Sequence, residues 1–230
     1  MKKDSLSILS VISFSLISLV MLLSPTKASA YSINFLNSIN GNEYISSYNN
    51  VTTESFDSGG TTNWIWSGNY AIVDGSTTGK NAAPYGKSSA DASFYITVPK
   101  DVTAQSVSAT ATLPNTGSYY NYFGLWWGSV DAYNTITFLK DGNETGESFT
   151  GTQVVGSNAA NGSQTDPNSN LYVNFVDLKD FNGVRLTSSQ YAFEADNLSA
   201  GRSPVPIPAA AWLLGSGFIG LVGIRRKLNK

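Results

Sequence analysis

The sequence predicts an all-β domain, an antiparallel β-sandwich of the jelly-roll type, between an N-terminal export signal and a C-terminal membrane segment. Three observations predict this fold class. From Val51 onward, short segments rich in β-branched and aromatic residues alternate with turns of Gly, Asn, Ser and Thr. No stretch between these segments has the period of a helix. No repeat of fixed length divides residues 31–203, so we expect one domain there.

The first 30 residues have the features of a secretory signal peptide. Lys2 and Lys3 precede an apolar stretch at 6–23, and Ala28-Ser29-Ala30 forms an A-x-A cleavage site. The sequence therefore predicts that signal peptidase cuts between Ala30 and Tyr31 and that the protein is exported. The alternative is an N-terminal anchor that is not cleaved.

The mature chain begins with a polar and aromatic segment, 31–50, which we interpret as an N-terminal strand with a loop. Eleven further strands are predicted after it, at 53–56, 64–66, 70–73, 93–98, 107–113, 119–127, 133–139, 147–150, 171–176, 184–187 and 191–198. Asp141-Gly142 is a hairpin-turn signal, because glycine accepts a positive φ. The segment 155–170, rich in Asn, Gly and Ser, is predicted to be a surface loop.

Alternation within the strands separates the predicted core from the other face. The expected core residues are Phe123, Leu125 and Trp127 on one strand, Ile136 and Phe138 on the next, and Leu171, Val173 and Phe175 on a third. Tyr120, Tyr122 and Trp126 lie on the opposite side of the first of these strands. Because both of its faces are aromatic, one of them is either covered by another layer or exposed for binding.

The last 27 residues, 204–230, read as a proline-rich spacer, an apolar run at 209–224 and the basic cluster Arg225, Arg226 and Lys227. As a helix, the 16-residue run is roughly 24 Å long. That is shorter than the roughly 30 Å hydrocarbon core, so it would span only with local thinning of the bilayer or with help from its flanking residues. The basic cluster predicts a cytoplasmic end, which places the domain outside.

The motif Val205-Pro206-Ile207-Pro208-Ala209, followed by Ala210-Ala211-Trp212-Leu213-Leu214-Gly215-Ser216-Gly217 and the basic cluster, resembles a PEP-CTERM sorting signal of the Val-Pro-x-Pro-Ala type. The resemblance implies transient anchoring in the inner membrane of a Gram-negative bacterium. It also implies cleavage by an exosortase, a membrane-embedded cysteine protease, and then release or transfer to the cell surface. The commoner motif has Glu where this chain has Ile207, which leaves the exosortase subtype open. An ordinary single-pass anchor is the alternative.

Two internal segments also resemble exosortase-sorted surface proteins. They are 123–138, which begins Phe123-Gly124-Leu125-Trp126-Trp127, and 192–197, Ala192-Phe193-Glu194-Ala195-Asp196-Asn197. The resemblance extends over roughly residues 56–200. It implies a β-sandwich surface module of no established activity.

Composition excludes several classes of function. Seven of the 14 Lys and Arg residues lie in the two terminal signals, whereas 15 of the 16 Asp and Glu residues lie at 31–203, giving that segment a net charge of −8. Such a charge argues against nucleic-acid partners. The chain has no Cys and no His, which excludes disulfides, Cys nucleophiles, Ser-His-Asp triads and the usual zinc sites.

Tyr120, Tyr122 and Trp126 are the candidate ligand platform, because sugar-binding sheets use rows of exposed rings. Thr135 and Thr137, on an adjacent strand, would supply the polar neighbours. Trp64 and Trp66 form a second same-side pair. Packing within the core is the competing interpretation for both sets of rings.

No cofactor and no catalytic residue are predicted, but a structural calcium ion is an open alternative. Its candidate ligands are Asp57, Glu194, Asp196 and Asn197, since calcium prefers several carboxylate and carbonyl oxygens. No ligand loop of fixed spacing is present, and solvated surface carboxylates are the other interpretation.

The sequence therefore predicts a non-enzymatic surface or matrix protein that is processed by an exosortase and associated with exopolysaccharide and biofilm. The biofilm role comes only from the family resemblance. The alternatives are a carbohydrate-binding module with an aromatic platform, self-association through edge strands, and a secreted glycosidase that uses two carboxylates.

Overall fold

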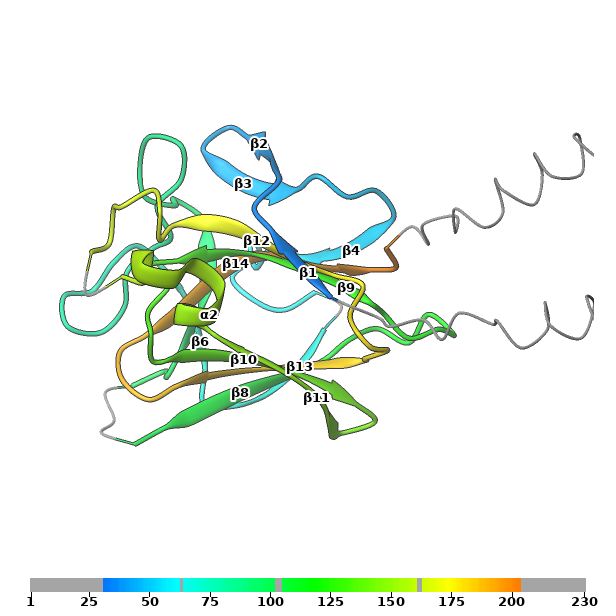
Figure 1. Cartoon of the computed structure of the whole chain (residues 1–230). Coiled ribbons are helices and arrows are strands. Elements are labelled where there is room, and N and C mark those ends of the chain that lie inside the picture. The colour runs from blue at the N-terminus through cyan, green and yellow to red at the C-terminus, as the bar shows by residue number, and fades with distance from the viewer. Residues whose placement is uncertain (1–30, 63, 102–104, 161–162, 204–230) are drawn as a thin grey trace, which may run out of the picture. The chain divides into compact units, whose positions relative to one another are not determined.

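The computed structural model describes residues 31–62, 64–101, 105–160 and 163–203 (Figure 1). The predicted signal peptide, with Ala28 and Ala30, lies outside the described residues. So do the predicted sorting motif at 205–209, the apolar run at 209–224 and the basic cluster at 225–227. Within the described part of the chain, no helix is both long and apolar enough to cross a membrane.

The described residues form an almost entirely β structure. The N-terminal part contains β1 (Ser32–Asn34), β2 (Asn37–Asn40), β3 (Glu43–Ser46), β4 (Val51–Glu54), β5 (Ile65–Gly68), β6 (Ala71–Asp74), β7 (Phe94–Val98) and β8 (Val107–Thr112). The remainder contains β9 (Tyr122–Gly128), β10 (Asn134–Lys140), β11 (Asn143–Thr150), β12 (Leu171–Val176), β13 (Gly183–Ser188) and β14 (Phe193–Gly201). A short helix, α2 (Gly151–Val155), and a 3₁₀ turn, η1 (Gly156–Asn158), follow β11.

These strands form two sheets and one separate hairpin. A seven-stranded sheet has the order β1-β12-β9-β14-β7-β6, with β4 also paired to β14. A five-stranded sheet has the order β11-β10-β13-β8-β5, and β2 pairs only with β3. All of these pairings are antiparallel. The prediction of an all-β, antiparallel fold is therefore confirmed.

One hydrophobic core joins the two sheets. Phe123, Leu125 and Trp127 of β9 belong to it, and so do Ile136 and Phe138 of β10. The Phe123 ring meets the Phe138 ring edge-on, with 5.6 Å between centroids, a geometry that aromatic pairs favour. The core face predicted from the alternation of these strands is confirmed. Val173 and Phe175 of β12 also lie in the core, and Leu171 packs against its margin.

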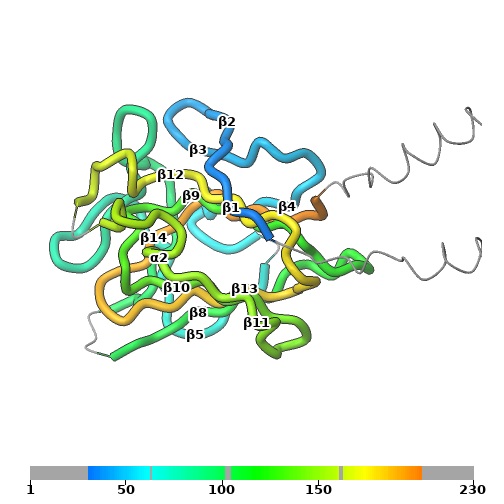
Figure 2. Tube along the Cα trace, in the orientation of Figure 1, coloured from blue at the N-terminus to red at the C-terminus, as the bar shows by residue number. Residues whose placement is uncertain are grey.

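A third layer covers the outer face of the seven-stranded sheet. Strand β3 packs across β12, β9 and β14, and Figures 1 and 2 show the β2–β3 hairpin, in blue, on the side of this sheet away from β10 and β13. Asn42, in the hairpin turn, accepts hydrogen bonds from the backbone N–H groups of Ser88 and Ser89 through Oδ1, at 3.0 and 3.2 Å. The hairpin is thereby tied to the loop between β6 and β7.

All eleven strands predicted after residue 50 correspond to observed strands, β4 to β14, with ends displaced by a few residues. The predicted turn is also confirmed, because Asp141 and Gly142 have φ of 51° and 80° between β10 and β11. Two features differ from the prediction. Residues 31–50 form three strands instead of one, and α2 was not expected. The helix begins with a capping box, in which Thr150 and Gln153 each bond the other's backbone.

Candidate functional site

The predicted aromatic platform is buried. The exposed fractions of Tyr120, Tyr122 and Trp126 are 4%, 1% and 0%, so the prediction that these rings form an exposed ligand surface is wrong. They also do not share one face. Tyr120 lies before the start of β9 and packs into the core between the sheets, with its ring 6.0 Å from that of Phe181. The strand alternation that we extended back to Tyr120 ends before reaching it.

Tyr122 and Trp126 do lie on the outer face of β9, but β3 and the residues after it cover them. The Tyr48 ring stacks on Tyr122 at 4.4 Å, and the Tyr44 ring meets Trp126 edge-on at 5.7 Å. The Ser46 hydroxyl lies 2.6 Å from the Tyr122 hydroxyl, which donates to Asn174 Oδ1 at 2.7 Å. The second aromatic face of β9 is therefore buried beneath β3 and the residues that follow it.

The other proposed parts of that platform are elsewhere. Trp64 and Trp66 are both buried in the core between the sheets, so core packing is the correct interpretation for this pair. Thr135 and Thr137 lie on β10, which belongs to the five-stranded sheet, whereas β9 belongs to the seven-stranded one. The prediction that they lie beside the platform is therefore wrong.

The four candidate calcium ligands do not form a recognisable metal-binding group among the described residues. Glu194 and Asp196 are both buried on β14, but the charges acting on Glu194 and on Asp196 come from different acids. Asp57 is exposed and accepts a bond from the Ser55 hydroxyl at 2.8 Å. Asn197 donates to Glu43 Oε2 at 3.2 Å. Among the described residues, no three acidic, histidine or cysteine side chains are placed to bind one metal ion by themselves.

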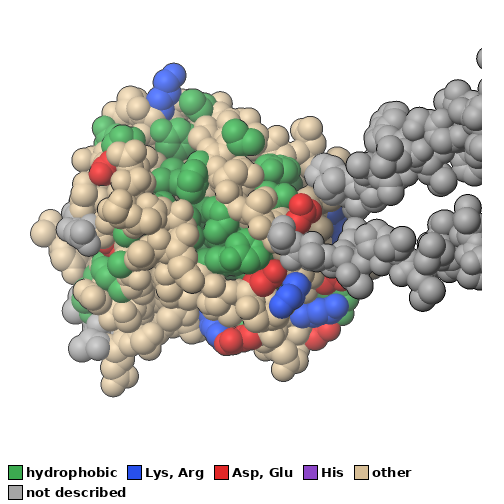
Figure 3. Space-filling view, in the orientation of Figure 1, with side chains coloured by type: hydrophobic (Ala, Val, Ile, Leu, Met, Phe, Trp, Pro, Cys, Tyr) green, Lys and Arg blue, Asp and Glu red, His purple; other side chains and the backbone are tan. Residues whose placement is uncertain are grey.

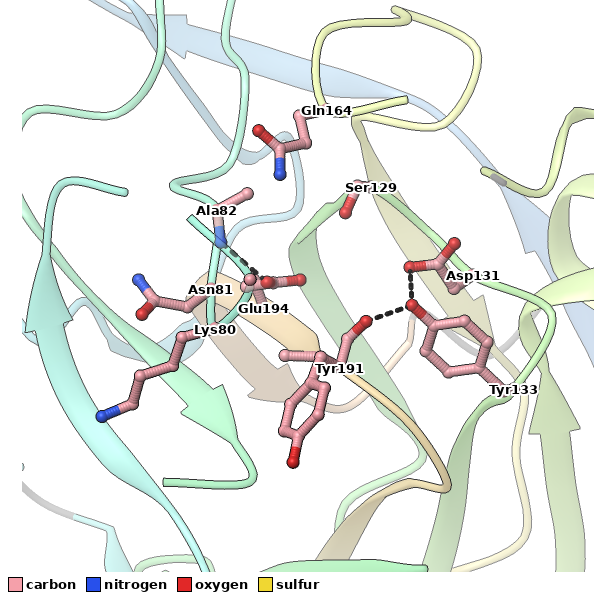
Figure 4. Close-up of a pocket in the computed structure, with 11 residues that line it drawn as sticks. Lys80, Asn81, Ala82, Ser129, Asp131, Tyr133, Gln164, Tyr191 and Glu194 are labelled. Atoms are coloured by element: carbon pink, nitrogen blue, oxygen red, sulfur yellow. Dashed lines mark hydrogen bonds between the residues drawn. The ribbon is translucent and has the colours of Figure 1, made fainter. Parts of the chain in front are cut away.

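A polar pocket lies where β9 ends and β14 begins, and we call it the Glu194 pocket. It is lined by Gly79, Lys80, Asn81, Ala82, Ser129, Asp131, Tyr133, Gln164, Tyr191, Ala192 and Glu194. Figure 4 shows Glu194 between Ala82 on one side and Asp131 and Tyr133 on the other, with the Lys80 side chain directed away. The cavity volume is about 190 Å³. That is smaller than the roughly 300–1,000 Å³ of pockets for drug-sized ligands, so the pocket fits one small polar unit.

Glu194 is the principal acid of this pocket. Its side chain is buried, and Oε1 accepts a hydrogen bond from the Ala82 N–H at 2.9 Å. Its other oxygen, Oε2, makes no hydrogen bond of good geometry, although the nearby Ser129 side chain lowers the pKa of this carboxyl group. Burial raises the pKa of Glu194 to about 8, against the lowering effect of the Ala82 bond. At neutral pH the carboxyl group is therefore mostly protonated, and it can both donate and accept a hydrogen bond.

Asp131 and Tyr133 form the opposite wall. The Tyr133 hydroxyl donates to Asp131 Oδ2 at 2.7 Å and also contacts the backbone carbonyl of Tyr191. Burial and the neighbouring Asp131 carboxylate both raise the pKa of Tyr133, so its hydroxyl keeps its proton. The charge of Asp131 also raises the pKa of Glu194, which places two acids of different environments in one pocket.

The loops that form the pocket are joined by Asn170. This buried side chain accepts hydrogen bonds through Oδ1 from the backbone of Ser129 at 2.9 Å and of Tyr85 at 3.0 Å. Its Nδ2 donates to the carbonyls of Gln164 and Asp166, at 3.3 and 3.0 Å. One amide therefore fixes three loops that are far apart in sequence, and Asn170 is a positioning residue.

Close packing at the end of β9 brings one of these loops onto the sheet. A Cβ atom at Gly128 would lie 2.9 Å from Pro84 Cα, a distance that real Cβ atoms do not show. Only glycine leaves room there for the loop that carries Ala82. The next residue, Ser129, has φ of 36°, and such a conformation is uncommon in residues other than glycine.

Sequence reasoning selected Glu194 but missed Asp131, Tyr133 and Asn170. The strand segment Phe193-Glu194-Ala195-Asp196 carried a usable signal, because acids that alternate with apolar residues face one side of a sheet. Nothing in the sequence shows that loops cover this side. The partnership of Asn170 with three loops depends on tertiary contacts alone.

Comparison with known proteins gives little further information. No protein-family model matches the chain, and no curated protein matches it. Among solved structures, the chain is similar to the carbohydrate-binding module TmCBM61 in complex with beta-1,4-galactotriose, with a TM-score of 0.33 and 14% sequence identity. The match covers 65% of this chain and 95% of that chain.

Proposed function

We propose that residues 31–203 form a jelly-roll-like carbohydrate-binding domain, which binds one unit of a neutral, hydroxyl-rich glycan in the Glu194 pocket. The proposal rests on the buried Oε2 of Glu194, which makes no hydrogen bond of good geometry and lies in a small polar cavity. A buried polar group without a partner is costly. A sugar hydroxyl would satisfy it on binding.

The chemistry of the walls favours a neutral ligand. A protonated Glu194 offers a donor and an acceptor, and a sugar hydroxyl needs both. Asp131 would repel an anionic sugar, because the two negative charges would lie close together in one small pocket. The Lys80 ammonium is paired with Asp101 at 3.2 Å, so it does not offset this repulsion. The half-buried Tyr191 ring adds an apolar surface to the lining.

The binding test compares two substitutions of Glu194 in the full-length chain purified in detergent. We would apply wild type, Glu194→Ala and Glu194→Gln to an array of neutral oligosaccharides and to exopolysaccharide from the native host, at pH 6. Glutamine reproduces the donor and acceptor of the protonated acid, so its affinity should stay within a few-fold of wild type. Alanine should weaken binding at least tenfold.

Asp74→Asn, at an exposed position on β6, is the matched control and should bind as wild type does. Thermal unfolding of each variant would show that the domain is folded. Equal binding by wild type and Glu194→Ala would contradict the assignment of the pocket. If wild type bound none of the neutral glycans, the proposed carbohydrate-binding function would be wrong.

Glycoside hydrolysis is a second candidate, favoured by the presence of two acids in one pocket, one of them protonated at neutral pH. A general acid of raised pKa beside a second carboxylate is the arrangement that such enzymes use. Glu194→Gln separates the two functions, because it preserves hydrogen bonding but cannot supply a proton. Release of reducing ends by wild type, abolished by Glu194→Gln with binding retained, would support hydrolysis. Binding without release supports a binding domain.

We further propose that the domain acts at the cell surface or in the matrix, after export through the signal at 1–30 and cleavage by an exosortase at the signal at 204–230. Support comes from the sequence resemblance alone, through Val205, Pro206, Ile207, Pro208 and Ala209. Intact mass of the protein from its native host tests it. A species from Tyr31 to near Pro208 is expected, and a species that retains 225–230 would indicate a plain anchor instead.

A further inference from the structure

The β2–β3 hairpin covers the domain without taking part in either of its sheets. In the described part of the chain, β2 and β3 pair only with each other. All four residues of β2 are exposed, and those of β3 are half-buried. Segments with few buried contacts and with backbone hydrogen bonds open to solvent are the ones that separate locally from a folded domain. The hairpin can therefore lift while the two sheets stay folded.

The surface beneath the hairpin contains polar groups that the hairpin covers but does not satisfy. The Asp196 carboxyl is buried and makes no hydrogen bond of good geometry, although the Asn197 N–H lowers its pKa. Opposite Asp196 in the sheet is Trp126, on which the Tyr44 ring packs edge-on at 5.7 Å. The Trp126 indole N–H is also buried without a partner. Because buried polar groups without good hydrogen bonds cost free energy, they oppose docking of the hairpin.

The turn of the hairpin clamps the loop that follows β6. Besides accepting bonds from the Ser88 and Ser89 N–H groups, the Asn42 side chain donates through Nδ2 to the Ser89 carbonyl at 2.8 Å. The Asn42 carbonyl accepts a bond from the Lys87 N–H at 3.0 Å. A Cβ atom at Gly86 would lie 2.1 Å from the Asn42 carbonyl oxygen, so only glycine permits this approach. Figure 2 shows the turn beside this loop.

The same loop, 82–91, forms one wall of the Glu194 pocket. The Ala82 N–H donates to Glu194 Oε1 at 2.9 Å. Three residues later, the Tyr85 N–H donates to Asn170 Oδ1 at 3.0 Å. The loop is therefore held at its base by the groups of the pocket and at its tip by the hairpin. A change in the position of the hairpin reaches the pocket through fewer than ten residues of chain.

We propose that the β2–β3 hairpin is a strap that controls the Glu194 pocket. When docked, it holds the loop 82–91 in place, and when it lifts, it releases that loop and weakens ligand binding. The effect on binding rests on the proposed glycan function, whereas the lifting of the hairpin does not. Because hairpin and pocket share one equilibrium, a ligand in the pocket must in turn favour the docked hairpin. Asn42 is the positioning residue of this strap, since it acts on the pocket through the loop.

Hydrogen exchange of the ligand-free, full-length chain in detergent, followed at single amides by NMR at pH 6, tests the strap itself. In wild type, the amides of β3 and of the loop 82–91, including that of Ala82, should exchange faster than those of β9. Asn42→Ala removes the clamp, so exchange at Ala82 should become roughly tenfold faster, as expected for the loss of hydrogen bonds at the loop tip. Gly86→Ala should act in the same direction, because its added Cβ forces the Asn42 carbonyl away.

Asn37→Ala, at an exposed position in the same hairpin, is the matched control and should leave exchange at Ala82 unchanged. Thermal unfolding of each variant would show that the domain is folded. If β3 exchanged as slowly as β9, or if Asn42→Ala kept the wild-type exchange rate at Ala82, the strap would be ruled out, whether or not a glycan binds.

Calorimetry at pH 6, with the neutral glycan selected on the array, tests the control of binding. Asn42→Ala should weaken affinity by roughly fivefold or more, and saturating glycan should slow exchange in β3 of wild type. Glu194→Ala should show no such protection. Wild-type affinity in Asn42→Ala would overturn the control of the pocket by the hairpin. If wild type bound no glycan, the proposed function alone would be wrong, and exchange at Ala82 would still decide whether the strap holds the pocket wall.

Discussion

Glu194 links the stability of the domain to pH at the scale of one residue. Its folded-state pKa of about 8 lies above the model-peptide value of 4.5, so the folded state holds the proton more tightly than the unfolded state does. The resulting stabilisation is complete below about pH 4.5 and is lost as pH rises through about 8. Asp196, whose pKa is also raised, acts in the same direction.

We therefore expect the free energy of unfolding, measured by urea denaturation in EDTA, to fall between pH 5 and pH 8. Glu194→Gln has no proton to lose at this position, so its pH dependence should be shallower than that of wild type. The remaining slope comes from Asp196 and from Glu43, Asp91 and Glu147, whose pKa values burial also raises, so it should become shallower still when Asp196→Asn is added. Identical slopes for wild type and Glu194→Gln would show that Glu194 is already ionised in the folded state.

Asn170 stabilises the loops around the pocket through hydrogen bonds and carries no charge. Asn170→Ala removes the bonds to Ser129, Tyr85, Gln164 and Asp166, and leaves buried backbone groups without partners. We expect a loss of about 1–3 kcal/mol in stability together with weaker glycan binding. Asn168→Ala, an exposed residue of the same loop, is the matched control. If the two variants had equal unfolding free energies and equal glycan affinities, Asn170 would not hold the pocket loops in place.

At the scale of elements, the β2–β3 hairpin decides what the aromatic face of β9 does. Alternation in the sequence placed Phe123, Leu125 and Trp127 in the core correctly, because one face of that strand meets the five-stranded sheet. It could not decide whether Tyr122 and Trp126 were open or covered, since the cover is a polar segment without clear periodicity. Short strands such as β2 and β3 carry too few residues to show a pattern.

Helix α2 was missed for a related reason. Five residues are little more than one turn, so no hydrophobic period is visible. The Thr150–Gln153 capping box was the available signal. The strands β4 to β14 were predictable because each is bounded by turn residues, and the hairpin at Asp141-Gly142 additionally sets the pairing of β10 with β11.

Truncation of Trp126 measures how completely the hairpin covers this face. Trp126→Ala should cost about 3–5 kcal/mol in unfolding free energy, the usual range for a buried aromatic residue. Ile65→Ala, at a side chain that is 72% exposed, should change stability by less than about 0.5 kcal/mol. Chemical denaturation would check both. If Trp126→Ala were as stable as wild type, the hairpin would not cover this ring and Trp126 would be exposed to solvent.

At the scale of the whole domain, the sheet edges bear on self-association. The edge strands β1, β5 and β6 have three or four residues, and short edges limit pairing with another chain. The longer edge strand β11 carries Glu144 and Glu147 and pairs with β10 through a register shift. Figure 3 shows apolar side chains exposed on one face of the domain. Tyr31, Phe35, Leu36 and Ile39 are among the exposed hydrophobic residues of the described chain.

We expect the short edge strands and the acidic residues of β11 to keep the domain monomeric at micromolar concentration. Light scattering coupled to size exclusion would measure the mass of the full-length chain, corrected for detergent, at several concentrations. The mass should stay that of one chain with and without calcium. A concentration-dependent dimer would favour self-association as the function, with the exposed apolar area or an edge strand as the interface.

The pH dependence of affinity shows whether the protonated form of Glu194 binds a neutral sugar. Calorimetric titration would use the glycan selected on the array, with wild type and Glu194→Gln at pH 6 and pH 9. Wild type should bind at pH 6 and lose affinity several-fold at pH 9, because Glu194 ionises near pH 8. Glu194→Gln should bind equally at both values. If wild type bound equally at pH 6 and pH 9, or if Glu194→Gln lost affinity in parallel with it, the protonated Glu194 carboxyl would not be the group that binds the sugar.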